Sequence, residues 1–142
     1  MRDYLFRGKH KKSGAWAYGY LDSFSESPKA RIICVTEKGT PFTVTVVPET
    51  IGQFTGLLDK NGARIFEGDI VKADLDFQPD ERVGLIGEIV FKKGAFMLSQ
   101  THRNPDLIDY YTSWLGDYHN IEEIGNKYDN PELLRQTNAP SN

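Results

Sequence analysis

The sequence has only one cysteine, Cys34, among its 142 residues. An internal disulfide framework and a multi-thiolate metal site are therefore excluded, and we expect a reducing, cytoplasmic setting. No run of about 18 apolar residues is present, so no membrane span is predicted. The first twelve residues lack the apolar core of a secretion signal, and we expect none. The formal net charge of the chain is −3, which does not favour nucleic-acid binding by the protein as a whole.

The sequence also lacks the usual patterns of catalytic and metal sites. His10, His102 and His119 are far apart and form no short ligand spacing, so no metal site is predicted. No glycine-rich phosphate loop, nucleophile elbow or zinc-protease pattern is present. We therefore expect a protein that is not an enzyme and that uses no cofactor.

Two acidic or nucleophilic features have plain structural interpretations. Cys34 lies among apolar residues with no neighbouring cation, which favours a buried structural thiol, although the fold could still bring a histidine to it. The segment 74–82 is acidic and contains Pro79, but it lacks the glycine and final glutamate of a calcium loop. It is predicted to be an exposed, solvated loop.

What the sequence has instead is many turn-forming residues that separate short segments with high β propensity. Thirteen glycines and seven prolines separate segments rich in Val, Ile, Thr, Tyr and Phe, a pattern typical of short strands. Trp16, Tyr18 and Tyr20 alternate and should line one face of a strand. The four apolar residues within Arg31–Thr36 suggest a strand covered on both faces. The predicted strands are Tyr4–Arg7, Ala15–Leu21, Arg31–Thr36, Phe42–Val47, Ile70–Ala73, Val83–Phe91 and Ala95–Ser99, and a hairpin turn joins the segments Gly52–Leu58 and Ala63–Phe66.

The middle of the chain contains the clearest turn signals: Asp59, Asn61, Gly62, Gly68 and Asp69. Asn-Gly tolerates the positive φ of a tight hairpin turn, and Gly68-Asp69 should bend the chain so that the next apolar residues enter the core. A carboxylate pair for acid–base chemistry is the alternative for the two aspartates. Turn chemistry is favoured, because Asp side chains readily bond the local backbone in turns.

The order of these strands is also typical of small SH3-like barrels. We expect a mainly antiparallel β protein with one domain over residues 1–135. Within it, residues 1–54 would form a β-sheet portion and residues 55–128 an SH3-like barrel portion. Asn130-Pro131-Glu132 predicts a short C-terminal helix, since Asn suits the N-cap and Pro the first helical position. The tail 136–142 is predicted to be disordered.

Charge is distributed unevenly along the chain. The first twelve residues hold five Lys or Arg against one Asp, whereas residues 105–135 hold seven acidic groups against two basic ones. A solvated surface, self-assembly or a protein partner, and single-stranded nucleic acid are the three interpretations. The candidate interaction surface consists of Arg7, Lys9, Lys11, Lys12, Trp16 and Tyr18, with the acidic segment 105–132 as its complement.

Several motifs in one order resemble the YopX family of phage and prophage proteins. These motifs are FRGK at Phe6–Lys9, GAWAYGY at Gly14–Tyr20, TIGQFTGLLDKNGARIFEGDIV at Thr50–Val71, GEIVF at Gly87–Phe91 and IGNKYDNPEL at Ile124–Leu133. The resemblance covers about residues 1–135. It implies a phage or prophage gene, but no established activity and no functional residues that could be transferred.

From these features we expect a non-enzymatic interaction module of the host bacterial cytoplasm. It should self-associate or bind a host or phage protein. The alternative is a nucleic-acid-binding accessory protein that uses the basic and aromatic N-terminal residues.

Overall fold

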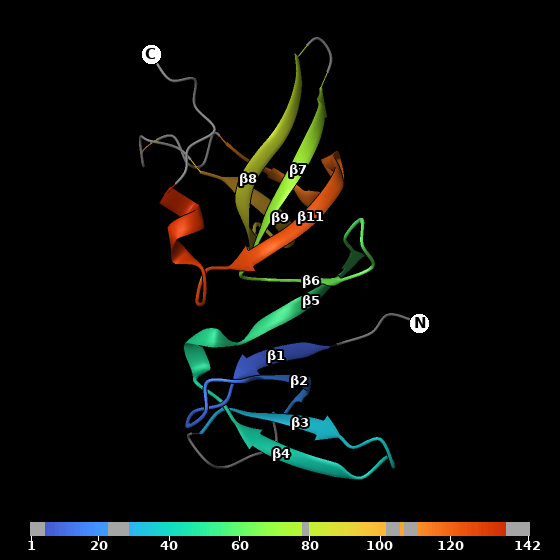
Figure 1. The fold of residues 1–142 in the computed structure, drawn as a ribbon, viewed down its shortest axis with the longest axis vertical. Helices are drawn as coiled ribbons and strands as arrows, with labels where there is room; N and C mark the ends of the chain where they lie inside the picture. The colour runs from blue at the N-terminus through green and yellow to red at the C-terminus, as the bar shows by residue number, and fades with distance from the viewer. Residues whose placement is uncertain (1–4, 23–28, 78–79, 102–105, 107–110, 136–142) are drawn as a thin grey trace. The chain divides into compact units, whose positions relative to one another are not determined.

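The computed structural model describes residues 5–22, 29–77, 80–101, 106 and 111–135 (Figure 1). The predicted tail 136–142 and His102 lie outside these residues. The chain divides into two compact units, Met1–Gly56 and Leu57–Asn142, whereas the sequence predicted a boundary after residue 54. Each unit is built mainly from antiparallel strands, which confirms the predicted class. Among the described residues, no helix is long and apolar enough to cross a membrane.

The first unit contributes β4, β3, β2, β1 and the start of β5 to a six-stranded antiparallel sheet with the order β4-β3-β2-β1-β5-β6. After β4 the chain returns to β1, where His10 bridges Val46, and Lys11 N–H donates to the Thr45 carbonyl at 3.0 Å. The unit contains β1 (Phe6–Lys9), β2 (Trp16–Leu21), β3 (Arg31–Val35), β4 (Pro41–Thr45), the 3-10 turn η1 (Pro48–Thr50) and the start of β5 (Gly52–Leu58).

The inner face of this sheet forms its core. Ala17, Ile32, Cys34 and Val46 are buried together. Gly8 lies directly against Val46, so that a Cβ at Gly8 would be 2.9 Å from the valine side chain. On β3 only this inner face is covered, because Val35 is 55% exposed. The prediction that this strand is covered on both faces is therefore wrong.

The second unit contains a five-stranded antiparallel sheet with the order β10-β9-β8-β7-β11. Its core includes Val71, Ile89, Leu98 and Leu115, each at most 2% exposed. Gly68 turns with φ +90°, and both Ile70 and Val71 beyond it are fully buried. The elements are β6 (Arg64–Phe66), β7 (Asp69–Phe77), β8 (Asp80–Lys92), β9 (Ala95–Gln100), β10 (Thr112–Trp114), the 3-10 turn η3 (Leu115–Asp117), β11 (Tyr118–Asn126) and the 3-10 helix η4 (Pro131–Arg135).

A long hairpin replaces the loop predicted for residues 74–82. Strands β7 and β8 remain paired as far as Phe77 and Asp80, with one register shift between Ala73 and Leu75 (Figure 1). The described polar residues of this segment belong to paired strands rather than to a loop. The loop prediction is wrong, because strand pairing there does not require an apolar face.

Two further predictions for the second unit are not confirmed. The five-stranded sheet is open, with β10 and β11 at its ends, so it is not a closed barrel. Near the C-terminus the described chain has a five-residue 3-10 helix, Pro131–Arg135, instead of the predicted helix. The side chain of Asn130 does not serve that helix, because its Oδ1 accepts the N–H of Asn126 at 3.2 Å.

Candidate interaction surface

Aromatic side chains of β2 share one face of the first sheet with cations of β1. The strand register pairs Arg7 with Tyr18 and Lys9 with Trp16. Directly opposed residues of antiparallel strands project to the same face, so four of the six predicted residues come together. Tyr18 is 47% exposed and Tyr20 58% exposed. The predicted aromatic alternation on this strand therefore produces a solvent-facing row.

Within this face, Arg7 supports the surface rather than forming it. Its guanidinium carbon lies 4.3 Å from the centroid of the Trp16 ring, and Arg7 is only 4% exposed. Lys9 Nζ lies 5.5 Å from the same centroid. Cation–π contacts of this kind hold an aromatic ring in one orientation. Trp16 is thus fixed by two cations, and the accessible part of the row begins at Tyr18.

The other two predicted cations, Lys11 and Lys12, lie in the turn between β1 and β2, and both are exposed. The His10 ring orders this turn, because its Nδ1 accepts the N–H groups of Lys12 and Ser13, each at 3.1 Å. His10 is therefore a structural residue here. The turn presents two adjacent positive charges on an ordered backbone.

The sequence analysis missed the aliphatic part of this face. Ile33 opposes Tyr20 across β2 and β3, so it shares the face of the tyrosine row, and Val35 follows two residues later on the same side. We define the outer face of the first sheet as Lys9, Trp16, Tyr18, Tyr20, Ile33 and Val35. The unbroken apolar run of β3 concealed this face, because periodicity cannot show which half of such a run is exposed.

In the second unit, Asp59 organises the turn predicted around Asn61 and Gly62. Its Oδ1 accepts the N–H groups of Asn61 and Ala63, both at 2.9 Å, and Oδ2 accepts the N–H of Glu123 on β11 at 3.0 Å. Burial raises the pKa of this carboxyl. The three N–H donors together lower it by more than burial raises it, so the pKa lies below its ordinary value. The carboxylate therefore joins the hairpin turn to the edge of β11.

Asp69 has a similar local role in the next bend. It is 1% exposed, and its Oδ2 accepts the N–H of Phe66 at 2.8 Å. Both aspartates thus bond the backbone of their own turns, as the turn interpretation predicted. This arrangement supports structural roles for the two conspicuous carboxylates of the sequence.

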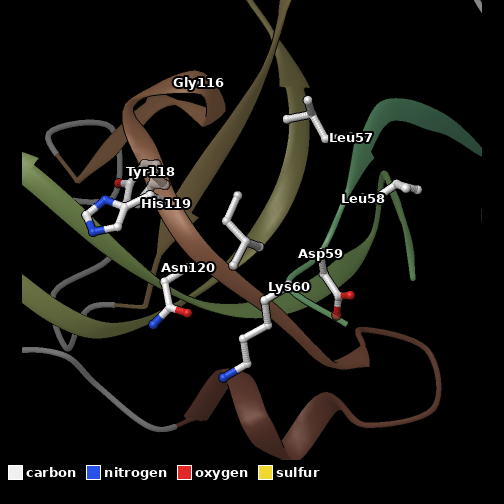
Figure 2. Close-up of a pocket in the computed structure, with 9 residues that line it drawn as sticks. Leu57, Leu58, Asp59, Lys60, Gly116, Tyr118, His119 and Asn120 are labelled. Atoms are coloured by element: carbon white, nitrogen blue, oxygen red, sulfur yellow. The ribbon is translucent and has the colours of Figure 1, made fainter. Parts of the chain in front are cut away.

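A pocket of about 370 Å³ lies between the end of β5 with its following turn and the start of β11 (Figure 2). Leu57, Leu58 and Ile121 provide its apolar lining. Leu57 and Leu58 are 42% and 57% exposed. The polar lining residues are Asp59, Lys60, Tyr118, His119 and Asn120, and Gly116 completes the set. The sequence analysis did not find this pocket, because it depends on contacts between segments about 60 residues apart.

Charged and strained groups border this pocket. Lys60 Nζ forms an ion pair with Glu122 Oε2 at 3.1 Å. Asn120 has a positive φ of 52°, and its Nδ2 donates to Asp74 Oδ2 at 3.0 Å. His119 and Asn120 both lie within β11, at a register shift. The Lys60 N–H donates to the Ile121 carbonyl at 2.8 Å, so the turn after β5 is bonded to the edge of β11 beside the pocket.

Two further titratable groups of the described residues, Cys34 and Glu88, have shifted pKa values. Cys34 is buried in the first core, where burial raises the pKa of its thiol and a backbone hydrogen bond with Tyr18 opposes that effect. Burial also raises the pKa of Glu88, while Lys127 lowers it. Over the described part of the chain, no three His, Cys, Asp or Glu side chains form a group that could hold a metal ion.

Comparison with known proteins gives a family match and similar solved structures. A family model described as YopX protein matches residues 5–135. No curated protein matches the sequence. The crystal structure of protein EF1440 from Enterococcus faecalis is similar, with 25% sequence identity and a TM-score of 0.50 over 94% of this chain and 99% of that one. The resemblance read from the sequence motifs is thereby confirmed.

Proposed function

The chain belongs to the YopX family, and we propose that it is a non-enzymatic interaction module that self-associates or binds a protein partner through the outer face of its first sheet. The phage or prophage origin and the cytoplasmic location expected from the sequence form part of this proposal. An SH3-like character of the second unit remains a fold analogy and adds nothing to it.

One observation supports the proposal above all others. Tyr18, Tyr20 and Val35 are each about half exposed on a single sheet face, next to the partly buried Trp16 and Ile33. Adjacent exposed aromatic and aliphatic side chains characterise protein interaction sites, where tyrosine and tryptophan supply much of the binding energy. The conspicuous carboxylates serve turns, and the lone thiol lies in a core. The exposed face is therefore the best candidate for a binding function.

The test compares a face variant with a matched aromatic control. We expect Tyr18→Ser with Tyr20→Ser to weaken self-association or partner capture at least tenfold. Trp114→Ser should leave both unchanged, because Trp114 is equally exposed, at 58%, but lies on β10. The measurements are sedimentation velocity of the purified protein and quantitative capture from nuclease-treated host lysate. Association that is unaffected by the tyrosine changes would refute the proposed surface.

A nucleic-acid-binding accessory role is the second candidate. Tyr18 and Tyr20 could stack on bases while Lys9, Lys11 and Lys12 contact phosphates, a combination found in single-strand binders. Such binding would weaken steeply with salt, with a slope that reports the number of phosphate contacts. Fluorescence anisotropy with a labelled 30-nucleotide single strand at 50 and 200 mM salt tests it. A salt-independent signal, or one unchanged by Lys11→Glu with Lys12→Glu, would exclude this role.

A further inference from the structure

The two units carry opposite net charges. Residues 1–56 hold eight Lys or Arg against five Asp or Glu, which gives +3, and residues 57–142 hold nine against fifteen, which gives −6. A chain with this asymmetry attracts the opposite end of a second copy, provided that complementary surfaces are exposed.

The exposed surfaces of the two units are complementary in chemistry. The first unit offers the tyrosine row of its outer face, bordered by Lys9, Lys11 and Lys12. The second unit offers a pocket whose apolar lining is Leu57, Leu58 and Ile121, set in a stretch of chain that is rich in acidic groups. Asp117 precedes the β11 residues of the pocket, and Glu122 and Glu123 follow them directly.

Acidic groups outnumber basic ones at the pocket: Asp59, Asp117, Glu122 and Glu123 lie in it or directly beside it, together with Lys60. Lys60 is the cation on the pocket lining, and Glu122 already pairs with it at 3.1 Å. His119 and the amide of Asn120 also face the pocket, and Asn120 is bonded to the carboxylate of Asp74. Asp117 and Glu123 are exposed. A basic surface with projecting aromatic rings therefore matches this pocket in both polarity and charge.

We propose that the partner of the outer face is a second copy of this chain, whose Leu57–Leu58–Ile121 pocket receives the Tyr18–Tyr20 row. The inference rests on the proposed function, because it names the partner of the same surface. The contact joins two different surfaces. It can therefore occur twice about a two-fold axis in a dimer, or repeat from copy to copy in a closed ring or an open chain.

The first test uses the full-length protein at low and high salt. At 20 mM salt the weight-average mass should rise with concentration to at least twice 16.1 kDa, and at 500 mM salt it should return toward 16.1 kDa. Lys11→Glu with Lys12→Glu should weaken association at least tenfold. The matched control is Lys92→Glu with Lys93→Glu, which reverses two adjacent lysines at the β8–β9 turn and should not weaken it.

The decisive test is a charge swap. In the variant with Lys11→Glu and Lys12→Glu, the border of the outer face and the pocket margin are both acidic. In the variant with Glu122→Lys and Glu123→Lys, both are basic. Each variant alone should stay monomeric, and an equimolar mixture should associate again. Leu58→Ser in the second unit should reduce association at least fivefold with unchanged charge. Circular dichroism of every variant verifies that it is folded.

The outcomes separate this inference from the proposed function. A wild-type protein that stays at 16.1 kDa at all concentrations overturns the second copy as partner. The proposed function then still stands if lysate capture depends on Tyr18 and Tyr20. Association that survives the lysine reversal, or a mixture that stays monomeric, also overturns the inference. If the wild-type protein neither self-associates nor captures a partner in a way that depends on Tyr18 and Tyr20, the proposed function is refuted as well.

Discussion

At the scale of single residues, Asp59 shows how a residue that looks catalytic acts as a structural one. Its two carboxylate oxygens accept three backbone N–H groups, two within its turn and one from Glu123 on β11. Charged acceptors stabilise such donors more than neutral ones do, and an N–H left unsatisfied on burial is costly. The DKNG motif therefore encodes an attachment of the hairpin turn to the second sheet.

Asp59→Asn should lower the free energy of unfolding by about 2 kcal/mol, because the charge and one acceptor oxygen are lost. Urea denaturation at pH 7 measures the change. Asp117→Asn provides the control, since Asp117 is exposed and should change stability by less than about 0.5 kcal/mol. Equal effects of the two changes would contradict the assigned role.

The same carboxylate predicts a pH dependence. A folded-state pKa below the ordinary value means that Asp59 stabilises the fold above the unfolded pKa of about 3.9, and that this contribution disappears as pH falls through the folded pKa. The stability difference between wild type and Asp59→Asn should therefore shrink below about pH 4. Asp74, whose pKa is also lowered by Gly84 N–H, is common to both proteins and cancels in the comparison. A constant difference from pH 7 to 2.5 would refute the prediction.

Cys34 offers a second test at this scale. It is 8% exposed within the first core, and burial raises the pKa of its thiol. A buried thiol with little thiolate reacts slowly. We expect a thiol reagent such as DTNB to label it at least 100-fold more slowly in the native protein than in 8 M urea. Rapid native labelling would show that the first core opens readily.

At the scale of elements, the closure of β1 against the end of β4 depends on Gly8. A Cβ at this position would be 2.9 Å from Val46, which is 1% exposed. Gly8→Ala should therefore destabilise the protein by about 1–3 kcal/mol through overpacking. Val46→Ala removes Cγ1 and Cγ2, at 3.1 and 2.9 Å, and keeps Cβ at 2.9 Å. It therefore relieves part of the overpacking, and the double variant should be more stable than the sum of the single effects predicts. Additive effects in denaturation experiments would show that the two side chains do not compete for space.

The sequence predicted elements well where alternation was undisturbed. Ala15–Leu21, where Trp16, Tyr18 and Tyr20 alternate, was predicted within one residue of β2 (Trp16–Leu21). Strand β11 was missed because two register shifts, between His119 and Glu122 and between Glu123 and Gly125, interrupt its period of two. In the candidate site, Trp16, Tyr18 and Tyr20 followed from alternation alone. The burial of Arg7, the exposure of Val35 and the pocket did not, because they depend on long-range pairing.

At the scale of the whole molecule, each unit has its own core cluster. Ala17, Ile32, Cys34 and Val46 form one, whereas Ile89 and Leu98 belong to the other. Separate cores allow cooperative units of different stability within one chain. This organisation suits a module that binds at one surface of each unit.

We therefore expect the two units to respond separately to core mutations. Ile32→Ala removes a side chain that is fully buried in the first core and should cost about 2–5 kcal/mol there. Native-state hydrogen exchange should then accelerate for amides of β1 to β4 and stay unchanged for β7 to β9. Leu98→Ala, fully buried in the second core, should have the reverse effect. If either change accelerated exchange equally in all strands, the chain would be one cooperative unit, because a shared core transmits any local loss of packing to every element.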